Sequence, residues 1–187
     1  MRLTRAAILA LARAFDRGTG SPWLTGERAL KGRLRRRAAR GSLYLTRREL
    51  VWLGEWKTPR IRPLIARNTA GGVRGLTAAA FMTKDEARRL RLLLGLSGVG
   101  VPVASVVLHF AAPARYPVYD VRVLTALRRL GGRRRFPPTP AGWLGYVECL
   151  RALARRHRVS LRTLDKALWR LGAPLHPPAR RAILESR

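Results

Sequence analysis

Two short segments hold the residues of this sequence that are best suited to chemistry: a glycine-containing turn and one aspartate that follows it, Asp120. Glycines let a backbone turn sharply, and amide groups beside the start of a helix form a binding site for an anion. We therefore predict that the turn holds a phosphate without reading base sequence. An ordinary turn between two helices, which also favours glycine, is the other interpretation. The turn residues are Leu96, Ser97, Gly98, Val99 and Gly100.

Asp120 stands just before an expected helix that begins at Val121. An ionised carboxylate can stabilise positive charge that develops on a reacting sugar, and it can orient or deprotonate water. Aspartate also suits the position before a helix, where it accepts hydrogen bonds from the first amide groups. The residue type leaves both roles open.

The elements that must position these residues are helices, because apolar residues recur at helical spacing and strand-like alternation is scarce. We predict an all-α fold. Thr46, with Glu49 three residues later, is typical of a capping box. Thr83 and Ser160 are expected to cap the helices that follow them. Ser21, Pro22 and Gly26 predict a loop, and we expect little structure after Gly172. The expected helices cover about 4–17, 46–58, 64–68, 73–82, 83–94, 102–110, 121–130, 141–156 and 161–171.

The charge of the chain points to a polyanionic partner. Lys and Arg number 39 against 10 Asp and Glu, which gives a formal net charge of +29. Nucleic acid is the first candidate and an anionic membrane surface the second. A codon-usage bias toward arginine explains why only four residues are lysine, but replacing lysine with arginine does not change the net charge. Apolar residues make up 47% of the chain, enough for a packed core.

Several other classes of protein are disfavoured. One cysteine, Cys149, excludes a disulfide within the chain, and His109, His157 and His176 are not spaced as metal ligands. No apolar run reaches the length of about 18 residues that a membrane span needs. Residues 1–15 predict an amphipathic helix rather than a signal peptide. We therefore expect a cytoplasmic, monomeric protein with no side-chain metal site.

The turn and the aspartate together resemble one known family. Residues 96–108 and 116–123 are similar to the hairpin, the following helix and the catalytic aspartate of the helix-hairpin-helix DNA glycosylase superfamily, in its endonuclease III branch. The resemblance covers about residues 90–130. It implies that Asp120 faces the glycosidic bond of a nucleotide flipped out of the duplex, since a base inside the stack is out of reach.

The departures from the family narrow the expected reaction. The lysine that family members use for strand cleavage corresponds to Pro102, which cannot form a Schiff base. A monofunctional glycosylase is therefore expected, although Lys57 could supply an amine from elsewhere. The family's histidine after the aspartate corresponds to Arg122, and the four cysteines of its iron–sulfur cluster are absent.

The resemblance also implies a single domain over 1–187 that is folded as two lobes. The central lobe would span about 55–119, with the hairpin at 90–110, and the second lobe would combine 1–54 with 120–187. The flipped base would occupy the cleft between them. A structural Na⁺ or K⁺ at the hairpin, held by the backbone carbonyls of Leu94, Leu96 and Val99, is likewise implied by the family.

Further residues are candidates for contact with DNA or with the flipped base, although each aromatic residue among them could equally belong to the core. Trp52 and Tyr116 are weaker candidates of the same kind, and Asp165 and Trp169 are expected to be structural. The candidates are Trp56, Lys57, Arg60, Pro102, Arg115, Tyr119 and Arg122.

We therefore expect a glycosylase that acts on double-stranded DNA in the nucleoid, without a cofactor other than a hairpin cation. The main alternative is a non-catalytic DNA-binding protein that uses the hairpin only to grip phosphate. A basic RNA-binding protein is a third interpretation. A pocket beside Asp120 that is deep enough for one base would favour the glycosylase, and a filled apolar cleft would favour the non-catalytic protein.

Overall fold

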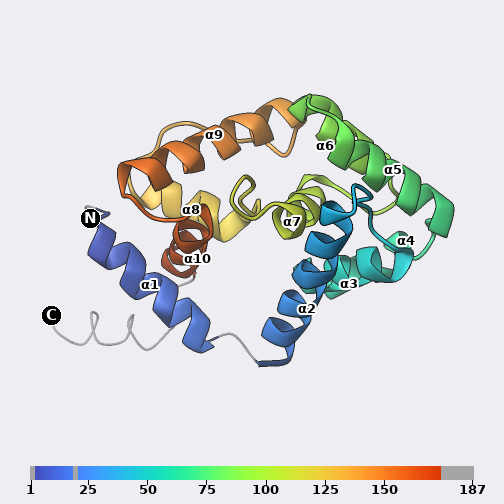
Figure 1. The fold of residues 1–187 in the computed structure, drawn as a ribbon. Coiled ribbons are helices and arrows are strands. Elements are labelled where there is room, and N and C mark those ends of the chain that lie inside the picture. Colours follow the sequence, from blue (N-terminus) through green and yellow to red (C-terminus); the bar gives the residue numbers. More distant parts are fainter. Residues whose placement is uncertain (1–2, 19–20, 174–187) are drawn as a thin grey trace, which may run out of the picture.

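The computed structural model describes residues 3–18 and 21–173, and this part of the chain is all-helical (Figure 1). The predicted all-α class is thus confirmed. The expected loosely structured tail after Gly172 lies almost wholly outside the described residues. The helices are α1 Arg5–Gly18, α2 Ser21–Ala39, α3 Arg47–Lys57, η1 Pro59–Ile61, α4 Arg62–Ile65, α5 Ala70–Met82, α6 Glu86–Leu94, α7 Val101–Ala111, α8 Val121–Arg129, α9 Pro140–Arg156 and α10 Leu161–Leu171.

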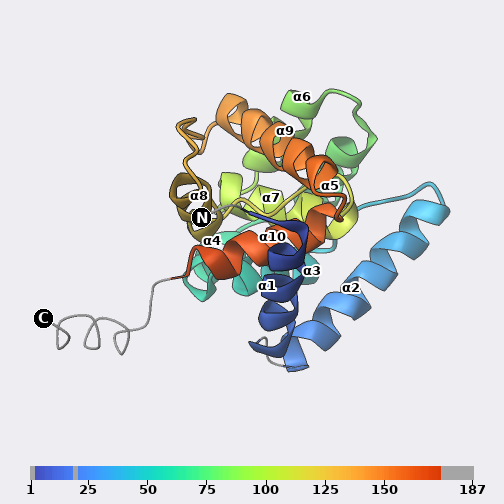
Figure 2. The same cartoon turned by 90° about the vertical axis from the view of Figure 1, so that its left-hand side faces the viewer.

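The helices form two groups that meet around α7 (Figures 1 and 2). In one group α10 packs on α1, α8 and α9, and in the other α2, α3 and α6 pack on α7. The lobe boundary expected between residues 54 and 55 falls inside α3, and the contacts of α2 and α3 group them with the central helices. Helix α1 alone of the N-terminal helices lies with the C-terminal group.

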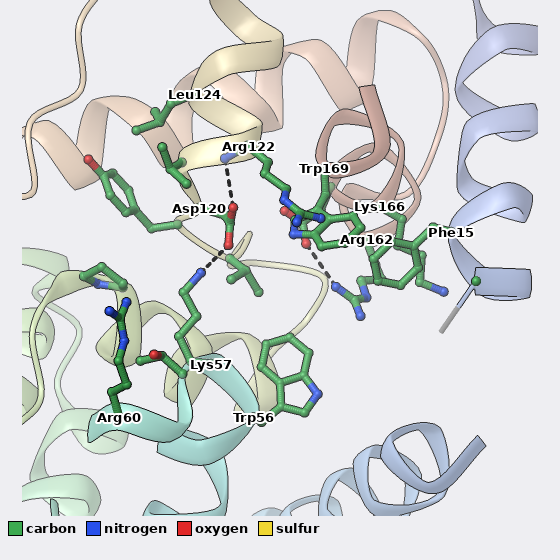
Figure 3. A pocket seen from close by; sticks show the side chains of 17 residues that line it. Phe15, Trp56, Lys57, Arg60, Asp120, Arg122, Leu124, Arg162, Lys166 and Trp169 are labelled. Atoms are coloured by element: carbon green, nitrogen blue, oxygen red, sulfur yellow. Dashed lines mark hydrogen bonds and ion pairs between the residues drawn. The ribbon is translucent and has the colours of Figure 1, made fainter. Parts of the chain in front are cut away.

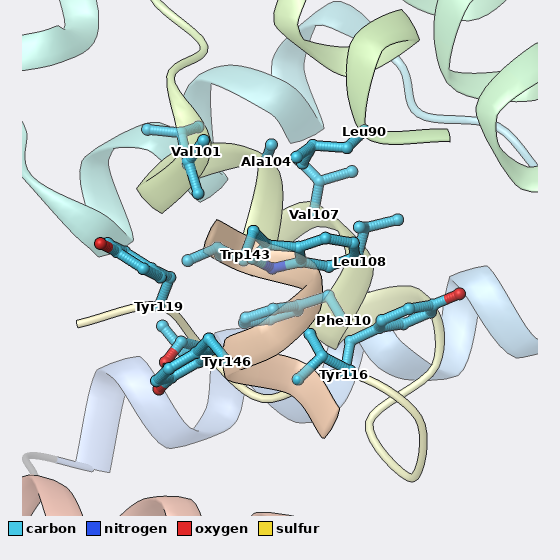
Figure 4. Packing of buried hydrophobic residues seen from close by; sticks show 14 of the residues in the cluster. Leu90, Val101, Ala104, Val107, Leu108, Phe110, Tyr116, Tyr119, Trp143 and Tyr146 are labelled. Atoms are coloured by element: carbon cyan, nitrogen blue, oxygen red, sulfur yellow. The ribbon is translucent and has the colours of Figure 1, made fainter. Parts of the chain in front are cut away.

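Helix α7 is the centre of the core. Residues 103–110 are all buried, which follows from their almost wholly apolar sequence. Figure 4 shows aromatic side chains packed around this helix. Trp143 of α9 lies stacked on Tyr116, with ring centroids 5.8 Å apart, and Tyr146 meets Tyr119 edge-on at 5.2 Å. A helix enclosed on all sides gives a rigid support to whatever its first turn presents.

Several helix starts were predicted wrongly. The segment expected as a loop around Ser21 and Pro22 is the beginning of α2, because serine and proline also suit the first turn of a helix. The N-cap of α6 is Asp85 rather than Thr83. The glycines at 71–72 lie in the first turn of α5, which is capped by Thr69, and do not separate two helices.

Other helix starts agree with the expectation. Thr46 and Glu49 form the capping box of α3, and Ser160 caps α10. No helix in the described part of the chain has the length and apolar character that a membrane span requires.

Candidate active site

A pocket of about 900 Å³ opens between the two helix groups, beside Asp120 (Figure 3). Side chains of α1, α3, α8 and α10 line it, together with the segment that leads into α8. The pocket therefore draws on both groups. Its volume lies within the usual range of small-molecule sites.

Asp120 both caps a helix and lines the pocket. Its Oδ1 accepts a hydrogen bond from the amide of Arg122 at 2.9 Å, so the residue is the N-cap of α8. Its Oδ2 lies on the pocket side and is 2.5 Å from Nζ of Lys57. Capping the helix uses one carboxylate oxygen and leaves the other for a ligand or a cation.

Lys57 reaches Asp120 from the last residue of α3, across the boundary between the helix groups. Its side chain is 12% exposed and that of Asp120 is 18% exposed, so the ion pair is largely shielded from bulk water. Shielding strengthens the attraction between the two charges. From the sequence, Lys57 was a candidate amine at a position different from that of the family's lysine. In the structure its Nζ lies beside the carboxylate of Asp120.

Gly98 gives the hairpin its shape. Its φ of +74° belongs to the left-handed region, and a Cβ there would come within 2.8 Å of Cβ of Leu64 and 3.0 Å of the backbone nitrogen of Ile65. Both the backbone angle and the close approach to α4 thus require glycine. The predicted role of this glycine in the turn is confirmed.

Gly100 differs from Gly98, because its φ of −85° and ψ of 178° are open to any residue. The expectation that it too is needed for the sharp turn is wrong. Gly100 is the exposed N-cap of α7, and a Cβ would meet only Pro102 Cδ at 3.7 Å. The amides of Ser97 and Val99 are hydrogen-bonded, whereas those of Gly98 and Gly100 donate to no residue that the structure describes. These two amides lie beside the N-terminus of an 11-residue helix and can serve an anion.

Asn68 fixes the hairpin from the side, a contact that sequence reasoning missed. Its Oδ1 accepts from the amide of Ser97 at 2.8 Å, and its Nδ2 donates to the carbonyl of Ser97 at 2.9 Å and to that of Ile65 at 2.8 Å. A single amide side chain therefore ties the turn to the end of α4. No spacing rule in the sequence points to a partner 29 residues away.

One of the carbonyls implied as cation ligands already accepts a hydrogen bond within the hairpin. The carbonyl of Leu96 already accepts from the amide of Val99 at 3.0 Å. No group of three or more His, Cys, Asp or Glu side chains in the described residues could hold a metal ion. The hairpin Na⁺ or K⁺ at Leu94, Leu96 and Val99 stays a prediction.

The pocket collects most of the other predicted contact residues. Arg115 is the exception, because it lies exposed and pairs with Glu86 at 2.8 Å instead. Pro102, where the resemblance would place a lysine, also lines the pocket. The predicted residues that line the pocket are Trp56, Lys57, Arg60, Pro102, Tyr119, Asp120 and Arg122.

The aromatic candidates differ in their burial and in the contacts that hold their side chains in place. Tyr119 is buried, and its hydroxyl donates to the carbonyl of Phe136 at 2.6 Å, so it forms a fixed wall rather than a mobile wedge. Trp56 is partly buried and meets Phe110 edge-on at 5.3 Å. Trp52 also meets Phe110, at 5.7 Å, whereas Tyr116 is buried against Arg89 and Glu86. Trp52 and Tyr116 line no part of the pocket.

Comparisons with protein-family models, with characterised proteins and with solved structures find no match to this chain.

The opposite wall of the pocket was not anticipated. It is built by Phe15 and Gly18 of α1 and by the polar face of α10, which carries Arg162, Asp165, Lys166 and Trp169. Their spacing of three, four and seven residues places them on one side of a helix whose other side buries Leu161, Leu164 and Leu168. In the sequence, the presence of Asp165 and Trp169 on the polar side of this helix was the one sign that it faces a pocket.

Arg122 is turned toward this wall rather than toward open solvent. Its guanidinium lies 4.0 Å from the ring centroid of Trp169, close enough for a cation–π contact (Figure 3). It therefore orients the indole beside Asp120. The expected phosphate contact of Arg122 stays a prediction.

Proposed function

We propose that this protein is a DNA base-excision glycosylase that hydrolyses the N-glycosidic bond of a damaged or modified base flipped out of the duplex. The observation that carries the proposal is the pocket of about 900 Å³ beside Asp120, lined with aromatic rings and with cations from both helix groups. A filled cleft would have favoured a protein that only grips DNA. Such an enzyme would act in the nucleoid.

In this proposal Asp120 acts on the sugar. Departure of the base leaves positive charge on the sugar ring, and the Oδ2 of Asp120 supplies a fixed negative charge near it. The same oxygen can orient or accept a proton from the attacking water. The helix cap through Oδ1 holds the carboxylate in place, so that little reorganisation is needed during the reaction.

The hairpin supports the same proposal by holding the duplex. The free amides of Gly98 and Gly100 suit a backbone phosphate, and the net charge of +29 favours a polyanion. Neither feature selects a base sequence, which suits an enzyme that must search for rare lesions.

Base release from duplexes that each carry one modified base tests the proposal, with abasic sites revealed by hot alkali. Asp120→Asn is expected to lower the single-turnover rate by about 10²-fold or more, the usual size of losing one electrostatic contact to the transition state. Asparagine is a good helix cap, so the fold should survive.

The matched control is Asp85→Asn, which makes the same exchange at the N-cap of α6, outside the pocket. It is expected to release base at the wild-type rate. Full activity of Asp120→Asn would overturn the assigned role of Asp120. Tight duplex binding with no release of any tested base would favour the non-catalytic DNA-binding protein, and preference for structured RNA at equal salt would favour the RNA-binding protein.

A second activity, strand cleavage, is favoured by one observation: an amine lies 2.5 Å from the catalytic carboxylate. After loss of a proton to Asp120, Nζ of Lys57 could attack C1′ as the base leaves. Opening of the sugar ring at the C1′–O4′ bond would convert this adduct to an imine, and loss of a proton from C2′ would then expel the 3′ phosphate. Borohydride would reduce this imine to a stable protein–DNA adduct. Trapping by wild type but not by Lys57→Met would establish the lyase, and absence of an adduct during base release would leave a monofunctional enzyme.

A further inference from the structure

Asp165 has one carboxylate oxygen without a partner in the wall of the pocket. The residue is 3% exposed, and its Oδ2 accepts from Nη1 of Arg162 at 3.0 Å. Its Oδ1 is buried and has no hydrogen-bond donor among the residues that the structure describes. Leaving a buried acceptor without a donor is energetically costly, and more so when the acceptor is charged. A ligand in the pocket that brings a donor would remove this cost.

Arg162 holds Asp165 in a fixed orientation. Its Nη2 lies 3.4 Å from Oε1 of Glu27, which also pairs with Lys31 at 2.5 Å. The guanidinium is thus held by carboxylates of two helices, α2 and α10. Its Nε is buried and has no acceptor among the described residues. The wall therefore holds a fixed acceptor, itself covered by neighbouring atoms, on a residue whose other oxygen is already engaged.

The surroundings of Asp165 suit the flat face of a base. Trp169 lies one turn further along α10, Phe15 meets it edge-on at 5.2 Å, and Trp56 lines the facing side. In Figure 3, Arg162, Trp169 and Phe15 lie to one side of the Asp120–Lys57 pair. A base in this space can meet aromatic rings while its edge reaches the wall, and its sugar can face Asp120.

Asp165 is an acceptor under physiological conditions. Burial raises the pKa of its carboxyl to about 6, and the Asp120 charge adds to this, while Arg162 and Lys57 oppose the rise. The carboxylate is therefore mostly ionised at neutral pH.

We propose that Asp165 reads the flipped base, with Oδ1 accepting a hydrogen bond from a ring N–H or an amino group on the base edge. This inference rests on the proposed glycosylase function and deepens it by naming the substrate class. Substrates are bases with an N–H donor at the edge facing α10. Counterparts that carry a methyl group or a bare ring nitrogen there are rejected, because they leave the buried oxygen unsatisfied.

Binding of duplexes with non-cleavable 2′-fluoro nucleotides tests the inference without relying on turnover. Two probe pairs differ only at one donor position: hypoxanthine against 1-methylhypoxanthine, and uracil against 3-methyluracil. A third pair, 8-oxoguanine against guanine, differs at the N7 donor and also at the C8 oxygen. For at least one pair, wild type is expected to bind the N–H member about 10- to 100-fold more tightly, the usual effect of a hydrogen bond to a charged group.

Asp165→Asn provides a sharper version of the test. Arg162 donates to the oxygen at the Oδ2 position, so it should retain the carbonyl of the asparagine and turn the amide NH₂ into the pocket. The pocket then offers a donor in place of an acceptor. The preference for the N–H member is expected to vanish or to reverse. Asp16→Asn is the matched control: this half-exposed acid pairs with Lys166 at 2.6 Å but does not line the pocket, so the variant should keep the wild-type preference.

The outcomes separate the inference from the function on which it rests. Base release by wild type together with an unchanged preference in Asp165→Asn would overturn the role of Asp165 alone. Equal binding of both members of every pair by wild type would do the same, whether or not the variant folds. No release from any duplex, and no preference for a modified over an undamaged duplex, would overturn both.

Discussion

The two carboxylates of the pocket wall, Asp120 and Asp165, lie in different surroundings. Asp120 caps a helix and pairs with Lys57, whereas Asp165 is buried with one oxygen unsatisfied. When environments separate two titratable groups in this way, they can take different roles in one site. Here one carboxylate would act on the sugar and the other on the base.

Burial of Asp165 predicts a pH dependence of stability. A carboxyl whose pKa rises on folding, here from 3.8 to about 6, favours the folded state when protonated. This contribution is complete below about pH 4 and is lost as the pH rises to about 6. The loss corresponds to about 3 kcal/mol. Urea unfolding at pH 4 and pH 7 should show wild type losing that stability relative to Asp165→Asn. A difference that stays constant with pH would contradict the prediction.

Single residues were predictable where sequence spacing defines their role. Asp120 follows a recognisable hairpin at a fixed distance, and its helix cap was one of its two expected roles. Lys57 and Asp165 reach the site through the packing of α3 and α10, which one sequence does not specify. Asp165 was expected to be structural, because an acid and a tryptophan on the polar side of a helix do not by themselves define the pocket that they line.

Among the elements, the hairpin contains two glycines with different expected roles: Gly98 is needed for stability, and Gly100 for binding. Gly98→Ala is expected to destabilise the protein by about 1–3 kcal/mol, because it combines a strained φ with a clash against α4. Gly100→Ala should leave the stability near that of wild type, since its backbone is extended and its surroundings are open. A methyl group beside the free amides should nevertheless weaken duplex binding. Thermal unfolding and binding titrations of both variants check this, and equal loss of stability would contradict it.

The contact between α8 and α10 depends on a third glycine. A Cβ on Gly172 would lie 1.7 Å from the carbonyl oxygen of Arg122, a backbone atom that cannot move aside alone. Gly172→Ala should therefore push the end of α10 away from α8 and lower both stability and base release. Gly71→Ala, where a Cβ meets nothing within 4 Å, is the control. The prediction fails if the melting temperature and the release rate both stay at wild-type values.

Most elements followed from helical periodicity and capping residues, as the boundaries of α3, α9 and α10 show. The errors occurred where residues have two uses. Ser21 and Pro22 suit a turn and a helix start equally, and the acids after Thr83 offered two caps for one helix. Packing chooses between such alternatives, and it depends on residues distant in sequence.

Over the whole molecule, the few acids are used as internal anchors while many arginines remain for a partner. Glu27, Glu49 and Glu86 each pair with two basic side chains. With 39 basic residues against 10 acidic ones, most of the positive charge has no acid to neutralise it. That surplus suits a polyanion with evenly spaced charges.

Binding to undamaged duplex should therefore depend steeply on salt. If six or more phosphates are contacted, affinity is expected to fall about 10³-fold or more between 50 and 200 mM salt. The logarithmic slope, measured by fluorescence anisotropy, gives the number of phosphates. A slope near zero would argue against any extended contact with DNA.

The Lys57–Asp120 pair also has a mechanical consequence. It joins α3 of one helix group to the start of α8 in the other, and so works as a clasp between the two groups beside the pocket. A nucleotide that draws Lys57 away to a phosphate or to its sugar would open this clasp at the moment of binding. The same ion pair would then control two things: whether the carboxylate of Asp120 is free to act, and how far the two helix groups can move relative to each other.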